Sequence, residues 1–219
     1  MAMIVTIDGP AGSGKSTVAR LLADRLQIRY LDTGAMYRAI ALAVVQAELD
    51  ENDNDAVTEM AQACTIEFRK GSIYLNTVDV TDAIRAANVT AVASIVASIP
   101  DVRNRLVELQ KNIGTSGDLV SEGRDQGTVV FPHAAHKFFI TASLTTRARR
   151  RHREMLSKGS TLPLQTVKSQ LRQRDSRDEN RVYAPMKPAI DAHVIDTSEM
   201  SIGEVVGTLV NKIRPAVSR

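Results

Sequence analysis

The feature that most constrains this chain is a glycine-rich run close to its start, placed between an apolar segment and an amphipathic one. The run fits G-x-x-x-x-G-K-[ST] and reads Gly9-Pro10-Ala11-Gly12-Ser13-Gly14-Lys15-Ser16. Residues 3–7 are nearly all apolar and predict a strand buried on both faces, because an exposed strand would alternate. Residues 14–26 carry apolar side chains at helical spacing and predict a helix that packs on a sheet. Strand, loop and helix in this order are the context in which the pattern binds phosphate.

The residue types of this run predict how a nucleotide would bind. Glycines allow consecutive backbone N–H groups to turn inward, where they and the helix N-terminus bind a phosphate oxygen. The Lys15 ammonium is expected to reach the β- and γ-phosphates, and the Ser16 hydroxyl to hold Mg²⁺ as the cofactor. The expected ATP-binding residues are Gly9, Pro10, Ala11, Gly12, Ser13, Gly14, Lys15, Ser16 and Thr17.

Further apolar runs predict the architecture around this loop. Strand-like runs occupy residues 28–31, 119–121, 137–141 and 193–195, and amphipathic segments occupy 35–46, 101–111, 145–157 and 201–213. Strands that alternate with helices form parallel sheets, so the predicted fold is α/β, a five-stranded parallel sheet flanked by helices. The strand-like pieces 64–68, 72–75 and 78–80 predict a small β-hairpin insertion with helices beside it.

Composition bounds the class of protein. The chain has 219 residues, 43% of them hydrophobic, and a single cysteine, which suits one globular domain without disulfides. We interpret Cys64 as a small buried residue. The four histidines stand at no metal-ligand spacing and are taken as structural. The first residues resemble no secretory signal, and no apolar run reaches the roughly 18 residues of a membrane span, so a cytoplasmic location is expected.

Basic residues gather in one stretch of the chain. Residues 147–181 hold eleven Lys and Arg against four acidic residues, a composition that favours a polyanionic partner, either nucleic acid or nucleotide phosphates. The run Arg147–Arg153 has the same two interpretations, a lid that closes over a phosphoryl donor or a nucleic-acid patch. The sequence lacks the [NT]-K-x-D element of guanine-specific switches and the Asp-Glu strand end of large motor ATPases. These absences favour a small-molecule kinase.

Five stretches carry a closer resemblance: residues 7–17, Asp32-Thr33-Gly34-Ala35-Met36-Tyr37-Arg38, residues 94–103, Glu122-Gly123-Arg124-Asp125-Gln126-Gly127-Thr128-Val129-Val130-Phe131-Pro132, and Arg174-Asp175-Ser176-Arg177-Asp178-Glu179-Asn180-Arg181. With these stretches the chain resembles bacterial cytidylate kinases, nucleoside monophosphate kinases with a phosphate-binding loop, over essentially its full length. The resemblance implies a single domain: a core at 1–33, 118–147 and 183–219, a nucleoside monophosphate (NMP)-binding region with a β insertion at 34–117, and a basic helical lid at 148–182. In that family pattern, Ser121, Glu122 and Gln126 are departures, and Glu122 could orient a water of Mg²⁺ or have a structural role.

The resemblance also assigns the acceptor site. Cytosine presents an amino donor beside two acceptors, so a carboxylate and a guanidinium can recognise it. The resemblance gives Asp125 and Arg103 this role, helped by the hydroxyls of Ser94 and Thr33, and a site so built should reject UMP. It places Arg38 and Arg124 on the CMP phosphate and Tyr37 near the sugar. Arg174, Asp178 and Arg181, on one face of a helix or its end, are assigned to the ribose and to the phosphate or base of the acceptor.

The expected function is ATP-dependent phosphoryl transfer to CMP or dCMP, giving ADP and CDP or dCDP. The expected catalytic residues are Lys15, Arg124, Arg150 and Arg177. The expected partners are the small molecules ATP and CMP or dCMP, with no stable nucleic-acid partner and no membrane, and the expected state is a monomer. Two alternatives stay open: a kinase for another small acceptor, such as UMP, dTMP or shikimate, and an RNA-binding regulatory ATPase.

Overall fold

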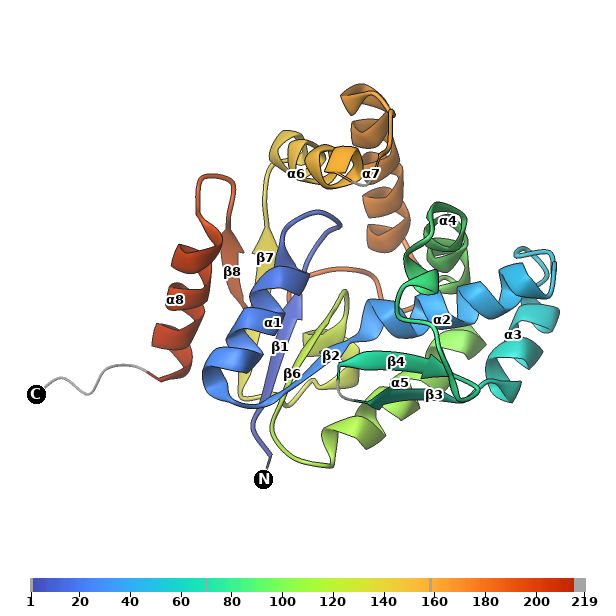
Figure 1. Ribbon diagram of the computed structural model, residues 1–219. Coiled ribbons are helices and arrows are strands. Elements are labelled where there is room, and N and C mark those ends of the chain that lie inside the picture. The colour runs from blue at the N-terminus through green and yellow to red at the C-terminus, as the bar shows by residue number, and fades with distance from the viewer. Residues whose placement is uncertain (1, 70, 158, 215–219) are drawn as a thin grey trace, which may run out of the picture. The chain divides into compact units, whose positions relative to one another are not determined.

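The computed structural model describes residues 2–69, 71–157 and 159–214 (Figure 1). Residues 1, 70, 158 and 215–219 lie outside the described residues. They fall within the core, NMP-binding and lid regions predicted from the sequence. The chain separates into two compact units. The first combines Met1–Leu31 with Gly114–Arg219, and the second is Asp32–Ile113. The region boundaries predicted from the sequence stay a prediction.

The predicted core strands form one five-stranded sheet with the order β2-β6-β1-β7-β8. Their bounds are β1 (Ile4–Asp8), β2 (Arg29–Asp32), β6 (Leu119–Gly123), β7 (His136–Thr141) and β8 (His193–Asp196). The pairings of β1 with β6, of β1 with β7 and of β7 with β8 are parallel. The strand that precedes the glycine-rich run therefore lies at the centre of the sheet, and the predicted fold class is confirmed.

Helices α1 (Lys15–Leu26) and α8 (Ile202–Ile213) pack on one face of this sheet (Figure 1). Their apolar side chains form a core with Val5 and Ile7 of β1 and with Phe138 and Ile140 of β7. Because side chains alternate along a strand, Thr6 and Asp8 point to the opposite face. That face is polar but buried, and the short π-helical turn η2 (Gln126–Val130) lies against β1 there.

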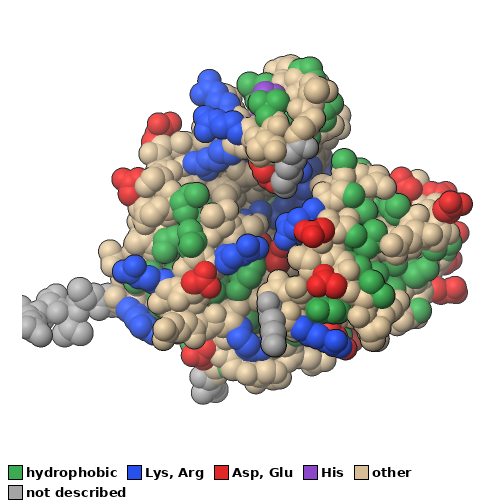
Figure 2. Space-filling view, viewed as in Figure 1, with side chains coloured by type: hydrophobic (Ala, Val, Ile, Leu, Met, Phe, Trp, Pro, Cys, Tyr) green, Lys and Arg blue, Asp and Glu red, His purple; other side chains and the backbone are tan. Residues whose placement is uncertain are grey.

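The basic stretch forms two helices that pack on each other, α6 (Leu144–Ser157) and α7 (Leu164–Glu179). Figure 2 shows Lys and Arg side chains gathered over α6. A small apolar cluster between them joins Ala148, Val167 and Leu171 to Ala11 of the glycine-rich run. The packing of α6 and α7 is thus tied directly to that run.

The second unit holds the remaining helices and a small sheet of its own. Its elements are α2 (Thr33–Gln46), α3 (Asn54–Ala63), β3 (Ile66–Arg69), β4 (Ser72–Leu75), β5 (Val78–Asp79), η1 (Ala83–Arg85), α4 (Ala87–Val96) and α5 (Pro100–Gly114). The side chain of Asp32 caps α2 by accepting a hydrogen bond from the Ala35 N–H at 2.9 Å. Helix α2 packs against α4.

The insertion differs from the expected hairpin, because β3, β4 and β5 form a three-stranded antiparallel sheet. The tight turn between β4 and β5 explains the third strand. Asn76 and Thr77 both have positive φ, 48° and 73°, the backbone of a two-residue hairpin turn that matches strand twist. In the described part of the chain, no helix has the length and apolarity needed to cross a membrane.

Candidate active site

The glycine-rich run forms a loop between the centre of the sheet and the first turn of α1. Gly9, Gly12 and Gly14 have positive φ, at 146°, 75° and 91°. At Gly9 the need for glycine is also steric, because a Cβ there would lie 2.0 Å from the carbonyl oxygen of Ile140. Pro10, Ala11 and Ser13 are buried, whereas Ser16 and Thr17 are exposed on the first turn of α1. The predicted phosphate-binding conformation is thus possible only with glycine at its tightest position.

Lys15 is buried beside this loop, and its Nζ donates to the carbonyl oxygen of Pro10 at 3.2 Å. Burial, and then the positive charge of Arg124, lower the pKa of Lys15 to about 7. Glu122 opposes this shift, and Arg174 adds to it. A buried ammonium with guanidinium groups close by is electrostatically poised for an anion.

Ser16 and Tyr30 both donate hydrogen bonds to the carboxylate of Glu122. The Ser16 Oγ lies 2.9 Å from Glu122 Oε2, and the Tyr30 hydroxyl lies 2.7 Å from Glu122 Oε1. Glu122 is 2% exposed at the end of β6, on the face that α1 covers. The contact orients this carboxylate toward the residue expected to hold Mg²⁺, and Tyr30 has no counterpart in the sequence-based prediction.

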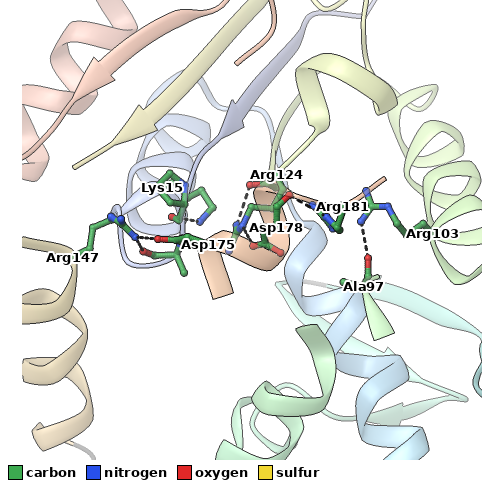
Figure 3. Close-up of polar contacts among 11 residues, drawn as sticks. Lys15, Ala97, Arg103, Arg124, Arg147, Asp175, Asp178 and Arg181 are labelled. Carbon is green, nitrogen blue, oxygen red and sulfur yellow. Dashed lines mark hydrogen bonds and ion pairs between the residues drawn. The ribbon is translucent and has the colours of Figure 1, made fainter. Parts of the chain in front are cut away.

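Arg147 of α6 and Asp175 of α7 form a buried ion pair, and both side chains also hydrogen-bond to the glycine-rich loop (Figure 3). The Arg147 guanidinium donates to the carbonyl oxygen of Ala11 at 3.1 Å, and the Ala11 N–H donates to Asp175 at 3.4 Å. Arg147 belongs to the basic run noted in the sequence, but neither Arg147 nor Asp175 was predicted to have a role of its own. The only signal in the sequence for this ion pair was the basic character of the run that contains Arg147.

Arg150, predicted as a catalytic residue, also contacts the glycine-rich loop. Its guanidinium donates to the carbonyl oxygen of Ser13 at 3.2 Å and to the carbonyl oxygen of Thr197 at 2.6 Å. A polar hollow of about 440 Å³ lies beside it, lined by Thr146, Arg149, Arg150, Arg153, Ser198, Glu199, Met200 and Ser201. Arg177 lies elsewhere: it is exposed on α7, beside a shallow depression that Arg172, Gln173 and Ser176 also line.

Arg124 and Asp178 bring the end of β6 to the end of α7 (Figure 3). The Arg124 Nε donates to Asp178 Oδ2 at 2.9 Å, and the Arg181 Nε donates to the carbonyl oxygen of Asp178 at 3.3 Å. Burial would raise the pKa of Asp178, but Arg124, Arg174 and Arg181 outweigh it and hold the pKa below its usual value. The structure therefore brings together four residues that the sequence assigned to the acceptor, with Asp125 buried next to Arg124 in the chain.

The second unit carries the other five predicted acceptor residues. Thr33 is buried at the start of α2, and Arg38 one turn later pairs with Asp32 at 3.2 Å. The Arg103 guanidinium lies over the Tyr37 ring, 5.6 Å from its centroid, and donates to the carbonyl oxygen of Ala97 at 3.1 Å.

Ser94 of α4 completes this set. Its hydroxyl is buried, and within the part of the chain that the structure describes it makes no hydrogen bond. A buried hydroxyl in that state costs free energy unless a ligand satisfies it. Thr33, Tyr37, Arg38, Ser94 and Arg103 thus share one compact unit with polar groups suited to a ligand.

Comparison with known proteins places this site in a family. A family model described as cytidylate kinase matches residues 5–215. A cytidylate kinase of Burkholderia thailandensis is 45% identical over 93% of this chain and 89% of its own length. One of Carboxydothermus hydrogenoformans is 43% identical over 96% of the chain and 97% of its own length. A bifunctional pantoate ligase/cytidylate kinase of Synechococcus sp. is 43% identical over 99% of the chain, which spans only 41% of that longer protein.

A solved structure of an uncharacterised protein from Eubacterium ventriosum has a TM-score of 0.54 at 12% identity, covering 97% of this chain and 99% of that one, which supports the fold alone. The parallel sheet, the phosphate-binding loop and these relatives define a phosphotransferase of the nucleoside monophosphate kinase class. Within that class, the chain belongs to the cytidylate kinase family. The resemblance, the fold class and the cytidylate kinase function expected from the sequence are confirmed.

Proposed function

We propose that the chain transfers the γ-phosphoryl group of ATP to the phosphate of CMP or dCMP, and that the residues predicted from the sequence carry the reaction. The observation that carries the assignment is the cluster of buried Lys15 with half-buried Arg124 and Arg174, in which buried Asp178 is the carboxylate. Cations gathered in this way suit the phosphates of both nucleotides, because guanidinium and ammonium groups stabilise charge that spreads over the transferred group.

The donor binds residues 9–17 in this proposal. The backbone N–H groups of the loop receive the phosphates, and the Lys15 ammonium reaches the β- and γ-phosphates. Arg150 already contacts the carbonyl oxygen of Ser13, so its guanidinium is held beside the donor loop. The hollow between α6 and the segment after β8 adjoins the same arginine and has room for part of the donor. Arg177, exposed on α7, would have to act from a different position of the lid.

The residues at the loop fit Mg²⁺. The Ser16 hydroxyl and the Glu122 carboxylate are oxygen donors, the kind that a hard cation prefers, and they already contact each other. Bound Mg²⁺ neutralises charge on the β- and γ-phosphates. Ser16 and Glu122 would hold it, Glu122 directly or through water.

The acceptor binds through the remaining predicted residues. Asp125 accepts from the exocyclic amine of cytosine and Arg103 donates to its ring acceptors, while Ser94 and Thr33 add hydroxyl contacts. Arg38 and Arg124 bind the CMP phosphate, which guanidinium binds bidentately. Tyr37, Arg174, Asp178 and Arg181 bind the sugar and the adjoining phosphate or base.

The chemistry needs no general base from the protein. The nucleophile is a phosphate oxygen of CMP that is already anionic, and transfer passes through a loose state in which position and positive charge dominate. Lys15, Arg124 and Arg150 hold the two phosphates in line and stabilise the developing charge. Closure of the region around α6 and α7 excludes water, so that ATP is not hydrolysed without an acceptor.

The contacts that the basic run makes within the chain favour the interpretation as a lid and argue against the interpretation as a nucleic-acid patch. The Arg147 and Arg150 guanidiniums point at the glycine-rich loop and bond to Ala11, Ser13 and Thr197. Arg147 is buried and paired with Asp175, so it is not available to a nucleic-acid backbone, and Arg150 is held at the donor loop, where it can meet the phosphates of ATP. The monomeric state and the cytoplasmic location expected from the sequence are part of this proposal.

Initial rates of ADP formation test the proposal, with ATP-Mg²⁺ and CMP, dCMP, UMP, AMP, dTMP or shikimate as acceptor. We expect CMP and dCMP to exceed UMP by about 100-fold or more in kcat/KM, because uracil would leave buried polar groups unpaired. Asp125→Asn should lower kcat/KM for CMP by about 100-fold, whereas Asp24→Asn, at an exposed acid of α1, should leave it unchanged. Equal rates with CMP and UMP would contradict the assignment of the base site.

A further inference from the structure

Asp8 is a buried carboxylate to which the proposed chemistry gives no role. It ends β1 directly before the glycine-rich loop and is 4% exposed. Both carboxylate oxygens accept backbone hydrogen bonds, Oδ1 from the Gln126 N–H at 2.9 Å and Oδ2 from the Gly127 N–H at 2.8 Å. Burying a carboxylate costs free energy, so interactions of Asp8 must offset that cost.

The two N–H groups that Asp8 binds are the first of the π-helical turn η2 (Gln126–Val130). The first N–H groups of a helix have no partner within it and are usually satisfied by a side chain at its own start. Here a residue from the central strand supplies the cap, across a sequence separation of more than a hundred residues. Asp8 therefore anchors the start of this turn to the sheet.

Two further contacts hold the same short segment. The Ser121 hydroxyl donates to Oε1 of Gln126 at 2.7 Å, so two of the three residues expected to depart from the family pattern bond to each other. At Gly127 the backbone lies so close to β1 that an added Cβ would meet the Thr6 Oγ1 at 3.0 Å. The segment directly after Arg124 and Asp125 is thus fixed by hydrogen bonds and by close packing.

We propose that Asp8 is a positioning residue for the acceptor: by holding the N–H groups of Gln126 and Gly127, it fixes the backbone that presents Arg124 and Asp125 to CMP. This inference rests on the proposed roles of Arg124 and Asp125. Asp8 touches no substrate in this account and acts only through the segment it holds.

The ionisation of Asp8 gives the proposal a distinctive signature. Burial raises the pKa of Asp8 to about 7, against the opposing effect of its two backbone hydrogen bonds. The charged groups that face it are Asp125, which raises the pKa, Arg124, which lowers it, and Lys137 of β7, whose Nζ is held by Asp191. The carboxylate accepts both hydrogen bonds better than the protonated acid, so its hold on the segment weakens as the pH falls through neutrality.

The test compares Asp8→Asn with the unchanged enzyme in steady-state kinetics. The amide can accept one of the two hydrogen bonds but presents its own N–H groups to the second donor. At about pH 8 we expect KM for CMP to rise about tenfold while KM for ATP changes less than about twofold. Toward about pH 6 the ratio of the two CMP KM values should approach one, because protonated Asp8 is as neutral as asparagine. The phosphate of CMP titrates in both enzymes and cancels in this ratio.

A second pair of variants covers the case in which Asp8→Asn does not fold. Gly127→Ala pushes the segment away from β1 and should also raise KM for CMP selectively. Thr6→Ala removes the nearest atom, so the double variant Gly127→Ala/Thr6→Ala should restore KM, and Thr6→Ala alone serves as the control with unchanged KM values.

Three outcomes separate this proposal from the one it rests on. If Asp125→Asn leaves KM for CMP unchanged, the assigned acceptor site fails. The positioning role is overturned if Asp125→Asn raises KM for CMP but Asp8→Asn alters the KM values for CMP and ATP equally. It is also overturned if Gly127→Ala alters both KM values equally and Thr6→Ala does not restore them. The positioning role is also overturned if the ratio of the KM values for CMP of the wild-type and Asp8→Asn enzymes stays constant with pH.

Discussion

Burial and the neighbouring charge of Arg124 lower the pKa of Lys15 to about 7, so in the free protein this group exchanges its proton near neutrality. A phosphate-binding lysine works as a cation, and bound triphosphate supplies the negative charge that its surroundings lack. Ligand binding and proton binding are therefore linked at this residue.

Binding of ATP-Mg²⁺ at about pH 8 should take up a proton, by up to about one per site, because the triphosphate raises the pKa of Lys15 above the solution pH. Titration calorimetry in buffers of different ionisation enthalpy measures this uptake. Lys15→Arg is the matched variant, since a guanidinium stays protonated, and its uptake should fall close to zero. Proton release by the unchanged enzyme would contradict the shifted pKa.

Gly9 shows how a single backbone position fixes the loop. An alanine there would need an unfavourable φ of 146° and would place its Cβ 2.0 Å from the Ile140 carbonyl oxygen. Gly9→Ala should lower the free energy of unfolding by more than about 3 kcal/mol, measured by urea denaturation. Gly203→Ala, in α8 with open space around it, should instead raise it by about 0.5 kcal/mol. A Gly9→Ala protein as stable as the parent would contradict the loop geometry.

At the scale of the elements, α6, α7 and the glycine-rich loop are joined by the buried pair of Arg147 and Asp175. Removing one partner of such a pair leaves a buried charge without compensation. Arg147→Met should therefore cost about 3 kcal/mol of stability, and adding Asp175→Asn should restore about 1 kcal/mol or more. Urea denaturation of the four proteins of this cycle measures the coupling.

The exposed pair of Arg151 and Glu154 on α6 is the matched control. Arg151→Met should change the free energy of unfolding by less than about 0.5 kcal/mol, because water screens that pair. Additive effects of Arg147→Met and Asp175→Asn would show that the two side chains do not interact.

The strands, the loop and most helices could be predicted from the sequence because their signals are local. Residues 3–7 and the glycines after them lie within one short window, as do the apolar positions of α1. The Arg147–Asp175 pair and the Asp8 cap could not be predicted, because their partners stand 28 and 118 residues apart and no pattern links them. The turn η2 was missed for a related reason: its first N–H groups are capped from β1, so its own sequence carries no start signal.

The acceptor residues were predicted only through resemblance. Asp125 comes from one stretch of the sequence and Ser94 and Arg103 from another, and spacing alone gives no reason to group the three. Asp178 and Arg174 share a helix, and the structure adds the reason for the low pKa of Asp178, which is the positive charge of three neighbouring arginines. The arrangement that makes them a site exists only in the folded chain.

For the whole molecule, two of the buried groups with shifted pKa values, Asp8 and Lys15, pull stability in opposite directions along the pH scale. Asp8 has a raised pKa, so the folded state binds more protons than the unfolded state between about pH 4 and pH 7, and stability falls as pH rises there. Lys15 has a lowered pKa, so the unfolded state binds more protons between about pH 7 and pH 10, and stability rises with pH there.

These two linkages predict a local minimum of the unfolding free energy near neutrality in the ligand-free protein. Asp8→Asn should remove the falling limb, flattening the change between about pH 5 and pH 7 by on the order of 2 kcal/mol. Lys15→Met should flatten the rising limb above about pH 7 and leave the acidic limb in place. Urea denaturation at a series of pH values measures the slope of the unfolding free energy against pH on both limbs. A packing change that does not depend on pH shifts the whole curve and leaves these slopes unchanged. If Asp8→Asn leaves the acidic slope unchanged, its carboxylate is already ionised well below neutrality, and the pH signature of the acceptor site must then come from another group.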